Sequence, residues 1–234
     1  MIDRSIYRNK VEALKKSFII LGVNANEILK TYENNYFDNT SIPKKDSFIS
    51  LMKLDPSDEL IEYLKTKTNL SHFKDKRTNI EYAIDLVLGW LSEDAIIHHL
   101  KKRDIKCNLD GRDKYREFLS AKDISTQPDI SIEHNKKIIP LEIMNDWNDY
   151  WIKRNMIDLR DNKYHKLKQE KSLLLGFAPK SAKGILLDFS DNLDFEERYN
   201  PAYGKKSYTL RNIKNKLKDI NTCLAEITNS QNGK

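Results

Sequence analysis

Cysteine is nearly absent from this chain of 234 residues, which contains only Cys107 and Cys223. Two thiols do not build a disulfide-stapled fold, and neither has cysteine or histidine neighbours at the spacing of a zinc site. Long apolar runs are missing, and the N-terminus lacks the apolar segment of a signal peptide. We therefore expect a soluble cytoplasmic protein that does not engage a membrane.

Glycine and proline are also scarce, with 7 and 6 residues, and no repeat or low-complexity linker divides the chain. Hydrophobic residues make up 39% and charged residues 32%, enough for a core beneath a heavily charged surface. The net charge of +6 allows a polyanionic partner without requiring one, because acidic residues are plentiful as well. The length fits one compact domain.

Apolar residues recur at helical spacing near the N-terminus: Val11, Leu14, Phe18, Ile19 and Leu21. A second helical stretch covers residues 28–32, with Asn24 or Asn26 as its candidate cap. Pro43 breaks the pattern, and residues 55–58 begin another short helix. Residues 1–78 are therefore expected to form a helical region that supports the rest of the chain or builds a dimer.

The strongest helix signal covers residues 79–102, whose apolar face is broad. His98 and His99 point about 100° apart on this helix, so we interpret them as structural residues, not ligands of one metal ion. A short strand over 105–109 follows, then a turn, and residues 114–120 are expected to form a further helical turn.

Residues 126–150 are predicted to form a β-hairpin. Ile130 and Ile132 alternate with polar residues, the turn over 134–137 is polar, and 138–144 is a second, mostly apolar strand. Antiparallel pairing then brings Asp129, at the start of one strand, beside Glu142, near the end of the other. Two carboxylates at one end of a sheet are suited to binding Mg²⁺.

Further elements follow the hairpin: a basic helix over about 158–170 and strands over 173–177 and 184–189. Together with the preceding elements they predict an αβββαβ core over 79–190. Residues 191–234 are expected to pack on this core as a loop at 199–208, where basic and aromatic residues interleave, and an amphipathic helix over 209–227. Trp147 and Trp151 are expected to pack rather than to bind bases.

Pro128-Asp129, a hairpin and Glu142-Ile143-Met144 together resemble the PD-(D/E)xK motif of type II restriction endonucleases and related nucleases. This resemblance implies an α/β fold with a central mixed sheet flanked by helices. It also implies Mg²⁺, one or two ions per subunit, held by Asp129 and Glu142. In many members the first helix contributes a glutamate, and Glu93 matches that position as a further catalytic and metal residue.

The motif's lysine is Met144 in this chain, and a thioether neither carries charge nor donates a hydrogen bond. Three explanations are open. A lysine from elsewhere reaches the site, for which Lys163 is the preferred candidate and Lys153 the second. The reaction tolerates another residue at 144, as some restriction enzymes of this kind do. Or the chain is an inactive form.

The resemblance thus predicts a prokaryotic, Mg²⁺-dependent endodeoxyribonuclease, a type II restriction enzyme that cuts double-stranded DNA at a specific palindromic sequence as a homodimer. The alternatives are a structure-specific repair or recombination nuclease of the same fold, a catalytically inactive DNA-binding relative, and a basic α/β domain in which the motif occurs by chance. Six residues are candidate DNA contacts: Lys153, Arg154, Arg160, Lys205, Lys206 and Tyr208.

Overall fold

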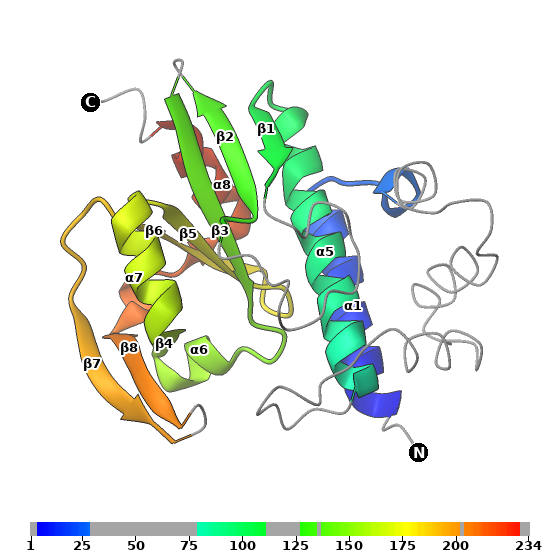
Figure 1. The fold of residues 1–234 in the computed structure, drawn as a ribbon. Coiled ribbons are helices and arrows are strands. Elements are labelled where there is room, and N and C mark those ends of the chain that lie inside the picture. Colours follow the sequence, from blue (N-terminus) through cyan, green and yellow to red (C-terminus); the bar gives the residue numbers. More distant parts are fainter. Residues whose placement is uncertain (1–3, 29–78, 111–126, 135–136, 202–203, 230–234) are drawn as a thin grey trace. The chain divides into compact units, whose positions relative to one another are not determined.

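A computed structural model describes residues 4–28, 79–110, 127–134, 137–201 and 204–229 of the chain. It is a mixed α/β fold with a mixed central sheet and helices (Figure 1). Two compact units are present: one comprises Met1–His99 and Arg112–Ser125, the other Leu100–Gly111 and Thr126–Lys234. The boundary lies near the end of helix α5 (Asn79–Lys101).

The first unit contains helix α1 (Arg4–Ile20) and nearly all of α5 (Asn79–Lys101), both predicted from the sequence. The predicted apolar stripe of α1 is buried except for Ile19, which is 80% exposed. It follows Phe18 directly and so points about 100° away from the buried side. The His99 ring donates a hydrogen bond from Nδ1 to the carbonyl of Leu21 at 2.7 Å, in keeping with its structural interpretation.

Asn24 is the cap of the next helical turn, since its side-chain oxygen accepts the N–H of Asn26 at 2.9 Å. Several sequence predictions lie outside the described residues: most of the stretch at 28–32, the break at Pro43, the helix after 55–58 and the turn at 114–120. Within the part of the chain that the structure describes, no helix has both the length and the apolar character needed to cross a bilayer.

The second unit is built on a six-stranded sheet in the order β1-β2-β3-β5-β6-β9. Its strands are β1 (Lys106–Leu109), β2 (Ile130–His134), β3 (Lys137–Asn145), β5 (Leu173–Ala178), β6 (Lys183–Asp188) and β9 (Lys218–Asp219). The predicted hairpin is confirmed as β2–β3, and β3 then pairs parallel with β5, while the other pairs are antiparallel. The sheet is therefore mixed.

A smaller three-stranded sheet, absent from the sequence prediction, has the order β4-β8-β7. Its strands are β4 (Met156–Arg160), β7 (Phe195–Asn200) and β8 (Lys205–Arg211). The sequence predicted a helix from about residue 158, and this start is wrong, because α7 spans Asp161–Glu170. Ile157 and Leu159 are buried with period two, which is a strand pattern.

Two backbone positions explain the new strands. Asn155 adopts a left-handed conformation, φ 54°, and ends the short helix α6 (Tyr150–Arg154), so that β4 begins directly after it. The loop expected at 199–208 is instead the turn of the β7–β8 hairpin and its flanking strand residues, with Gly204 at φ +58° near the turn. Glycine reaches that conformation without steric cost.

The helix expected over 209–227 is also wrong in its first half. Residues 209–211 complete β8, the 3-10 helix η3 (Ile213–Lys216) and β9 follow, and α8 spans Ile220–Asn229. Asn212 is left-handed, φ 57°, and interrupts any continuous helix. α8 packs on β6, where the side chains of Ile220 and Cys223 lie against Gly184.

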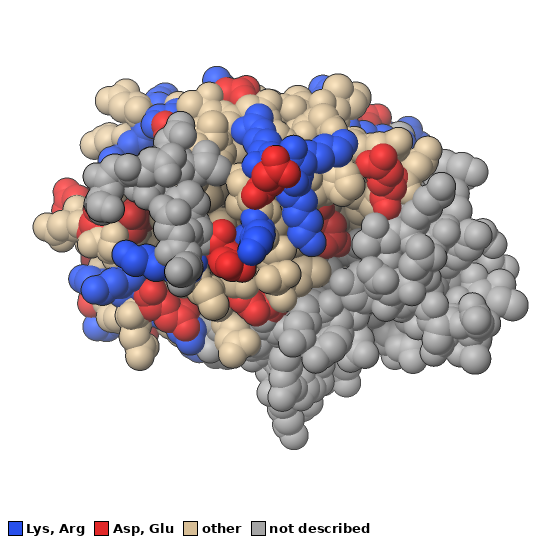
Figure 2. Space-filling view, turned by 90° about the horizontal axis from the view of Figure 1, so that it is seen from above, with Lys and Arg blue, Asp and Glu red and all other residues tan. Residues whose placement is uncertain are grey.

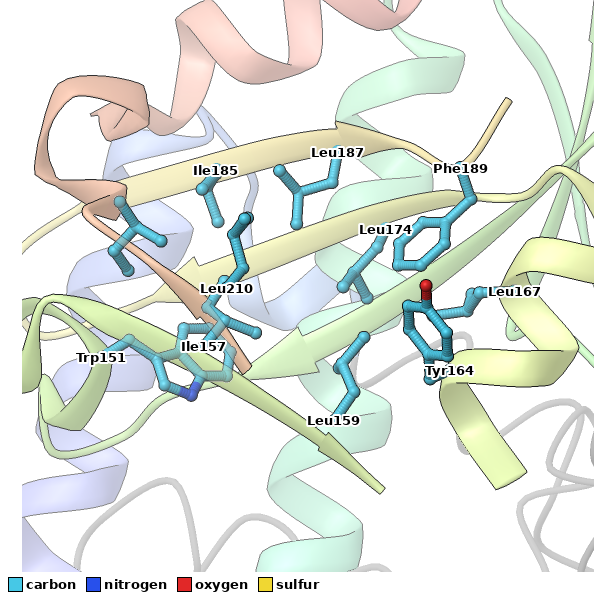
Figure 3. Packing of buried hydrophobic residues seen from close by; sticks show 11 residues of the cluster. Trp151, Ile157, Leu159, Tyr164, Leu167, Leu174, Ile185, Leu187, Phe189 and Leu210 are labelled. Carbon is cyan, nitrogen blue, oxygen red and sulfur yellow. The ribbon is translucent and has the colours of Figure 1, made fainter. Parts of the chain in front are cut away.

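One hydrophobic cluster joins the small sheet, α6 and α7 to the central sheet (Figure 3). Its buried members are Trp151, Ile157, Leu159, Tyr164, Leu167, Leu174, Ile185, Leu187, Phe189, Leu210 and Ile213. Trp151 is 8% exposed, which confirms its assignment to packing. Trp147 is half-buried and precedes α6. Burying an aliphatic or aromatic side chain contributes about 1.5–3 kcal/mol, so this cluster fixes where α7 lies on the sheet.

Candidate active site

Asp129 and Glu142 lie next to each other across the β2–β3 hairpin. Ile130 is in register with Leu141, so one further step along the antiparallel ladder places Asp129 opposite Glu142. The Asp129 carboxylate accepts the N–H of Ile143 at 2.8 Å through Oδ2. Its main-chain carbonyl accepts the N–H of Asp110, which follows β1, at 2.9 Å. The strands on both sides of β2 therefore hold Asp129 in place.

Lys163 completes this arrangement from helix α7. Its ammonium donates a hydrogen bond to Oε1 of Glu142 and forms an ion pair with it. The Glu142 side chain is 10% exposed and that of Lys163 is 36% exposed, so the pair lies at the edge of the interior. A cation in the first turn opposes the helix dipole. The contact with the Glu142 carboxylate, and not the helix dipole, therefore stabilises the charge of Lys163 at this position.

The charge state of Lys163 follows from its surroundings. Burial by itself would lower its pKa, but the charges of Glu142 and Asp129 and the hydrogen bond to Glu142 outweigh burial. Its pKa is therefore raised above the ordinary value, although the positive charge of Arg160 acts against this. Lys163 is cationic at neutral pH. It can donate hydrogen bonds and stabilise negative charge, but it cannot accept a proton.

Met144 lies two residues after Glu142 and so on the same face of β3. It is partly buried, packs against the hydrophobic cluster and stands in register with Gly176 of β5. A Cβ atom at Gly176 would lie 2.8 Å from Ile185 and 3.0 Å from Trp151, so side chains already fill the space above this glycine. The position that holds lysine in the motif belongs to the hydrophobic packing in this chain.

Glu93 lies on α5 in the first unit and is only 7% exposed, which excludes a merely solvated residue. The residues that the structure brings together, Asp129, Glu142 and Lys163, all belong to the second unit. The participation of Glu93 in a metal site stays a prediction from the sequence. Lys153, the second candidate for the missing lysine, instead donates a hydrogen bond to the carbonyl of Asn148 at 2.8 Å.

Lys206 and Tyr208, two of the candidate DNA contacts, are engaged with other residues. The Lys206 ammonium pairs with Glu197 at 2.7 Å, and the hydrogen bond to Glu197 raises the pKa of Lys206. The Tyr208 hydroxyl donates to Glu197 at 3.2 Å, and its ring stacks on Tyr164 with a centroid distance of 3.8 Å. Tyr208 thus packs the hairpin onto α7.

The remaining candidates for DNA contacts, Arg154, Arg160 and Lys205, are exposed. The Arg154 guanidinium lies over the ring of Tyr150, 5.8 Å from its centroid. Figure 2 shows Lys and Arg side chains interspersed with Asp and Glu over the face drawn there. The distribution of charge on this face therefore does not identify a binding surface by itself. The positions of individual side chains are needed to identify one.

The donor set at Asp129 and Glu142 fits Mg²⁺ better than a softer metal. Both side chains are carboxylates, and Mg²⁺ is commonly bound through one or two carboxylates while it retains several waters. Among the residues that the structure describes, no group of three or more His, Cys, Asp and Glu side chains forms a metal site. A structural zinc site would need such a group.

Two features were missed by the sequence analysis. The N–H of Ile143 holds the carboxylate of Asp129, and this contact depends on the register of the hairpin. Outside the immediate site, Arg198 of β7 was overlooked because no strand was predicted over 195–200. Compared with protein-family models and with curated proteins, the sequence matches none of them.

Proposed function

We propose that this protein is a Mg²⁺-dependent endonuclease that hydrolyses phosphodiester bonds of double-stranded DNA, of the type II restriction class. The observation that carries the proposal is the ion pair of Lys163 with Glu142 beside the anchored carboxylate of Asp129. Two carboxylates at one end of a sheet, with an ammonium from a neighbouring helix, are groups suited to metal-assisted phosphodiester hydrolysis.

The reaction needs an attacking water in line with the leaving oxygen and stabilisation of the charge that develops on the phosphate. Mg²⁺ bound by Asp129 and Glu142 would lower the pKa of a coordinated water and neutralise phosphate oxygens. Lys163 supplies what Met144 lacks: its ammonium donates hydrogen bonds to a phosphate oxygen or to the attacking water. Its raised pKa supports this cationic role and argues against a role as general base.

The N–H of Ile143 also has a role in this scheme. By binding Oδ2 of Asp129, it fixes the rotation of the carboxylate, so that the orientation of Oδ1 is determined before any ligand binds. Preorganised groups of this kind contribute more to catalysis than mobile ones, because they need no reorganisation during the reaction.

A palindromic DNA target would call for a two-fold symmetric dimer in which each subunit cuts one strand. We propose this homodimer as part of the restriction activity. Light scattering of the protein with and without a target duplex would test it. A monomer that makes independent nicks on both substrates would contradict the dimer and leave the chemistry at Asp129 and Glu142 unaffected.

The decisive experiment incubates the protein with mixed plasmid and phage DNA, with and without Mg²⁺, beside the Asp129→Asn variant. Discrete fragments that require both Mg²⁺ and Asp129 would establish a sequence-specific nuclease. Cleavage of branched DNA alone would favour a repair or recombination enzyme. Cleavage that appears only after Met144→Lys would identify an inactive relative, and no binding or cleavage of any DNA would refute the proposal.

A further inference from the structure

The β4-β8-β7 sheet has two chemically different faces. Ile157, Leu159, Tyr208 and Leu210 point toward the hydrophobic cluster and α7. Strand alternation places the intervening residues on the opposite face, which we call the outer face. Its members are Met156, Asp158, Arg160, Glu196, Arg198, Asn200, Lys205, Ser207, Thr209 and Arg211.

The register divides the outer face into a cationic and an acidic part. Arg160, Ser207 and Arg198 are in register across the three strands, and Lys205 pairs with Asn200 in the next row. These two rows hold three cations and no acidic residue. Arg160, Arg198 and Lys205 are all exposed. Because neighbouring strands lie about 4.7–4.9 Å apart, the two arginines stand roughly 10 Å apart at their backbones.

Both acidic residues of the outer face are engaged within the sheet itself. The Asp158 carboxylate accepts hydrogen bonds from the hydroxyl of Thr209 and, at 2.9 Å, from the amide of Asn200. Glu196 forms an ion pair with Arg211 at 3.1 Å. Both carboxylates are therefore engaged within the sheet, although that of Asp158 reaches Asn200 in the second cationic row.

The hydrogen bond between Asn200 and Asp158 also reveals the shape of this face. Thr209, in register with Asp158, and Lys205, in register with Asn200, stand four residues apart on β8. The side chains of Asn200 and Asp158 can come within 2.9 Å of each other only where the sheet curls toward the outer face. Ser207 lies enclosed within this concavity, 1% exposed.

The end of the cationic rows at Arg160 adjoins the helix that carries part of the candidate active site. Arg160 ends β4 and directly precedes α7, the helix that carries Lys163. Lys163 lies in the first turn of this helix, three residues after Arg160, and its ammonium contacts Glu142. A polyanion bound along the concave face would thus reach the reacting groups with one of its phosphates.

We propose that the outer face binds the phosphate backbone of the DNA beside the scissile bond, with Arg160, Arg198 and Lys205 contacting phosphates. This inference rests on the proposed nuclease function. It removes Lys206 and Tyr208 from the candidate DNA contacts, because both lie on the other face against Glu197. It adds Arg198, and it assigns these cations to positioning of the backbone rather than to reading of bases.

Lys205 and Lys206 provide a matched test, since they are adjacent, both exposed and point to opposite faces. Binding of a labelled duplex would be measured in Ca²⁺, without cleavage, over a series of salt concentrations. Each lost phosphate contact reduces the slope of log K against log salt by about 0.9, or roughly eightfold in affinity at 0.1 M salt. We expect this loss for Lys205→Gln and for Arg198→Gln, about twice the slope change for the double variant, and none for Lys206→Gln.

The outcomes separate the two proposals. Wild-type protein that neither binds nor cuts duplex DNA would refute the nuclease and the DNA surface together. Wild-type protein that cuts DNA, with Lys205→Gln and Arg198→Gln keeping the wild-type salt slope, would refute the outer face alone. An equal loss in Lys206→Gln would do the same. Thermal unfolding of each variant within a degree or two of wild type would confirm that folding is unaffected, as is usual for exposed side chains.

Discussion

The ammonium of Lys163 is hydrogen-bonded to the carboxylate of Glu142, although 21 residues and two different elements separate them. Met144 lies closer to Glu142 along the strand, yet its side chain packs into the hydrophobic cluster. The central sheet thus supplies the two carboxylates, and a helix packed on the sheet supplies the cation. Lys163 thus places a cation beside Glu142, while Met144 of the strand packs in the core.

Replacement of Lys163 by alanine should reduce the single-turnover cleavage rate by about 10²–10³-fold, the usual effect of removing one preorganised charge-stabilising group. DNA binding in Ca²⁺ should change little, since in the proposed reaction Lys163 would contact no phosphate other than the reacting one. Lys166→Ala is the control, because Lys166 lies on the same helix and pairs with Glu170 at 2.5 Å. Equal rates for the two variants would remove Lys163 from the mechanism.

Asp129→Asn should abolish Mg²⁺-dependent cleavage while the fold is retained. The amide oxygen of asparagine can still accept the N–H of Ile143, which Oδ2 of Asp129 accepts at 2.8 Å in the wild type. What is lost is the negative charge that a hard cation requires. Cleavage assays and the mid-point of thermal unfolding check the two halves of this prediction, and cleavage at the wild-type rate would contradict the assignment of the site.

The stabilisation provided by the Lys163–Glu142 pair should depend on pH only in the alkaline range. The pKa of Lys163 is raised in the folded protein, so the stabilisation is fully present below the unfolded-state value of about 10.4. It is lost as the pH rises through the higher folded-state pKa. Unfolding of wild type and Lys163→Met compared at pH 7, 9 and 11 should differ equally at the first two and less at the third. A difference that already shrinks between pH 7 and 9 would contradict the raised pKa.

Gly176→Ala should destabilise the protein by about 1–3 kcal/mol, the usual cost of overpacking a filled core. The new Cβ would meet Ile185 at 2.8 Å and Trp151 at 3.0 Å. Gly89→Ala is the matched control, because nothing lies within 4 Å of its Cβ position in α5. That change should stabilise by roughly 0.5–1 kcal/mol, since alanine is the better helix former. Denaturant unfolding would measure both free energies, and the same sign for both would refute this account of the packing.

Both cysteines should react slowly with thiol reagents in the native protein. Burial raises the pKa of Cys223 to about 11, and burial also raises the pKa of Cys107. At pH 8 the reactive thiolate is therefore a minor species, and both side chains are inaccessible. Reaction with a chromogenic disulfide before and after denaturation gives the test. Rapid modification of one native thiol would show that α8 or β1 opens readily.

The amino-acid pattern alone was sufficient for the β2–β3 hairpin and for the pairing of Asp129 with Glu142. Alternation of Ile130 and Ile132 with polar residues determines which side of the strand is buried, and the short turn determines the register. Helix α5 could also be predicted from the sequence, because its apolar residues repeat over many turns. These features depend on the local periodicity of apolar residues, which can be recognised within a short stretch of sequence.

Contacts between distant segments decided the rest. Ile157 and Leu159 are too few to distinguish a strand from a helix turn, and only pairing with β8 makes β4 a strand. Likewise Lys163 was one of two candidate lysines until the packing of α7 brought it to Glu142. The faces of Lys205 and Lys206 follow from the register of the β7–β8 hairpin. The periodicity of residues along the chain predicts which side chains share a face of a helix or strand. Which surface that face packs against depends on the burial of segments that are far apart in sequence.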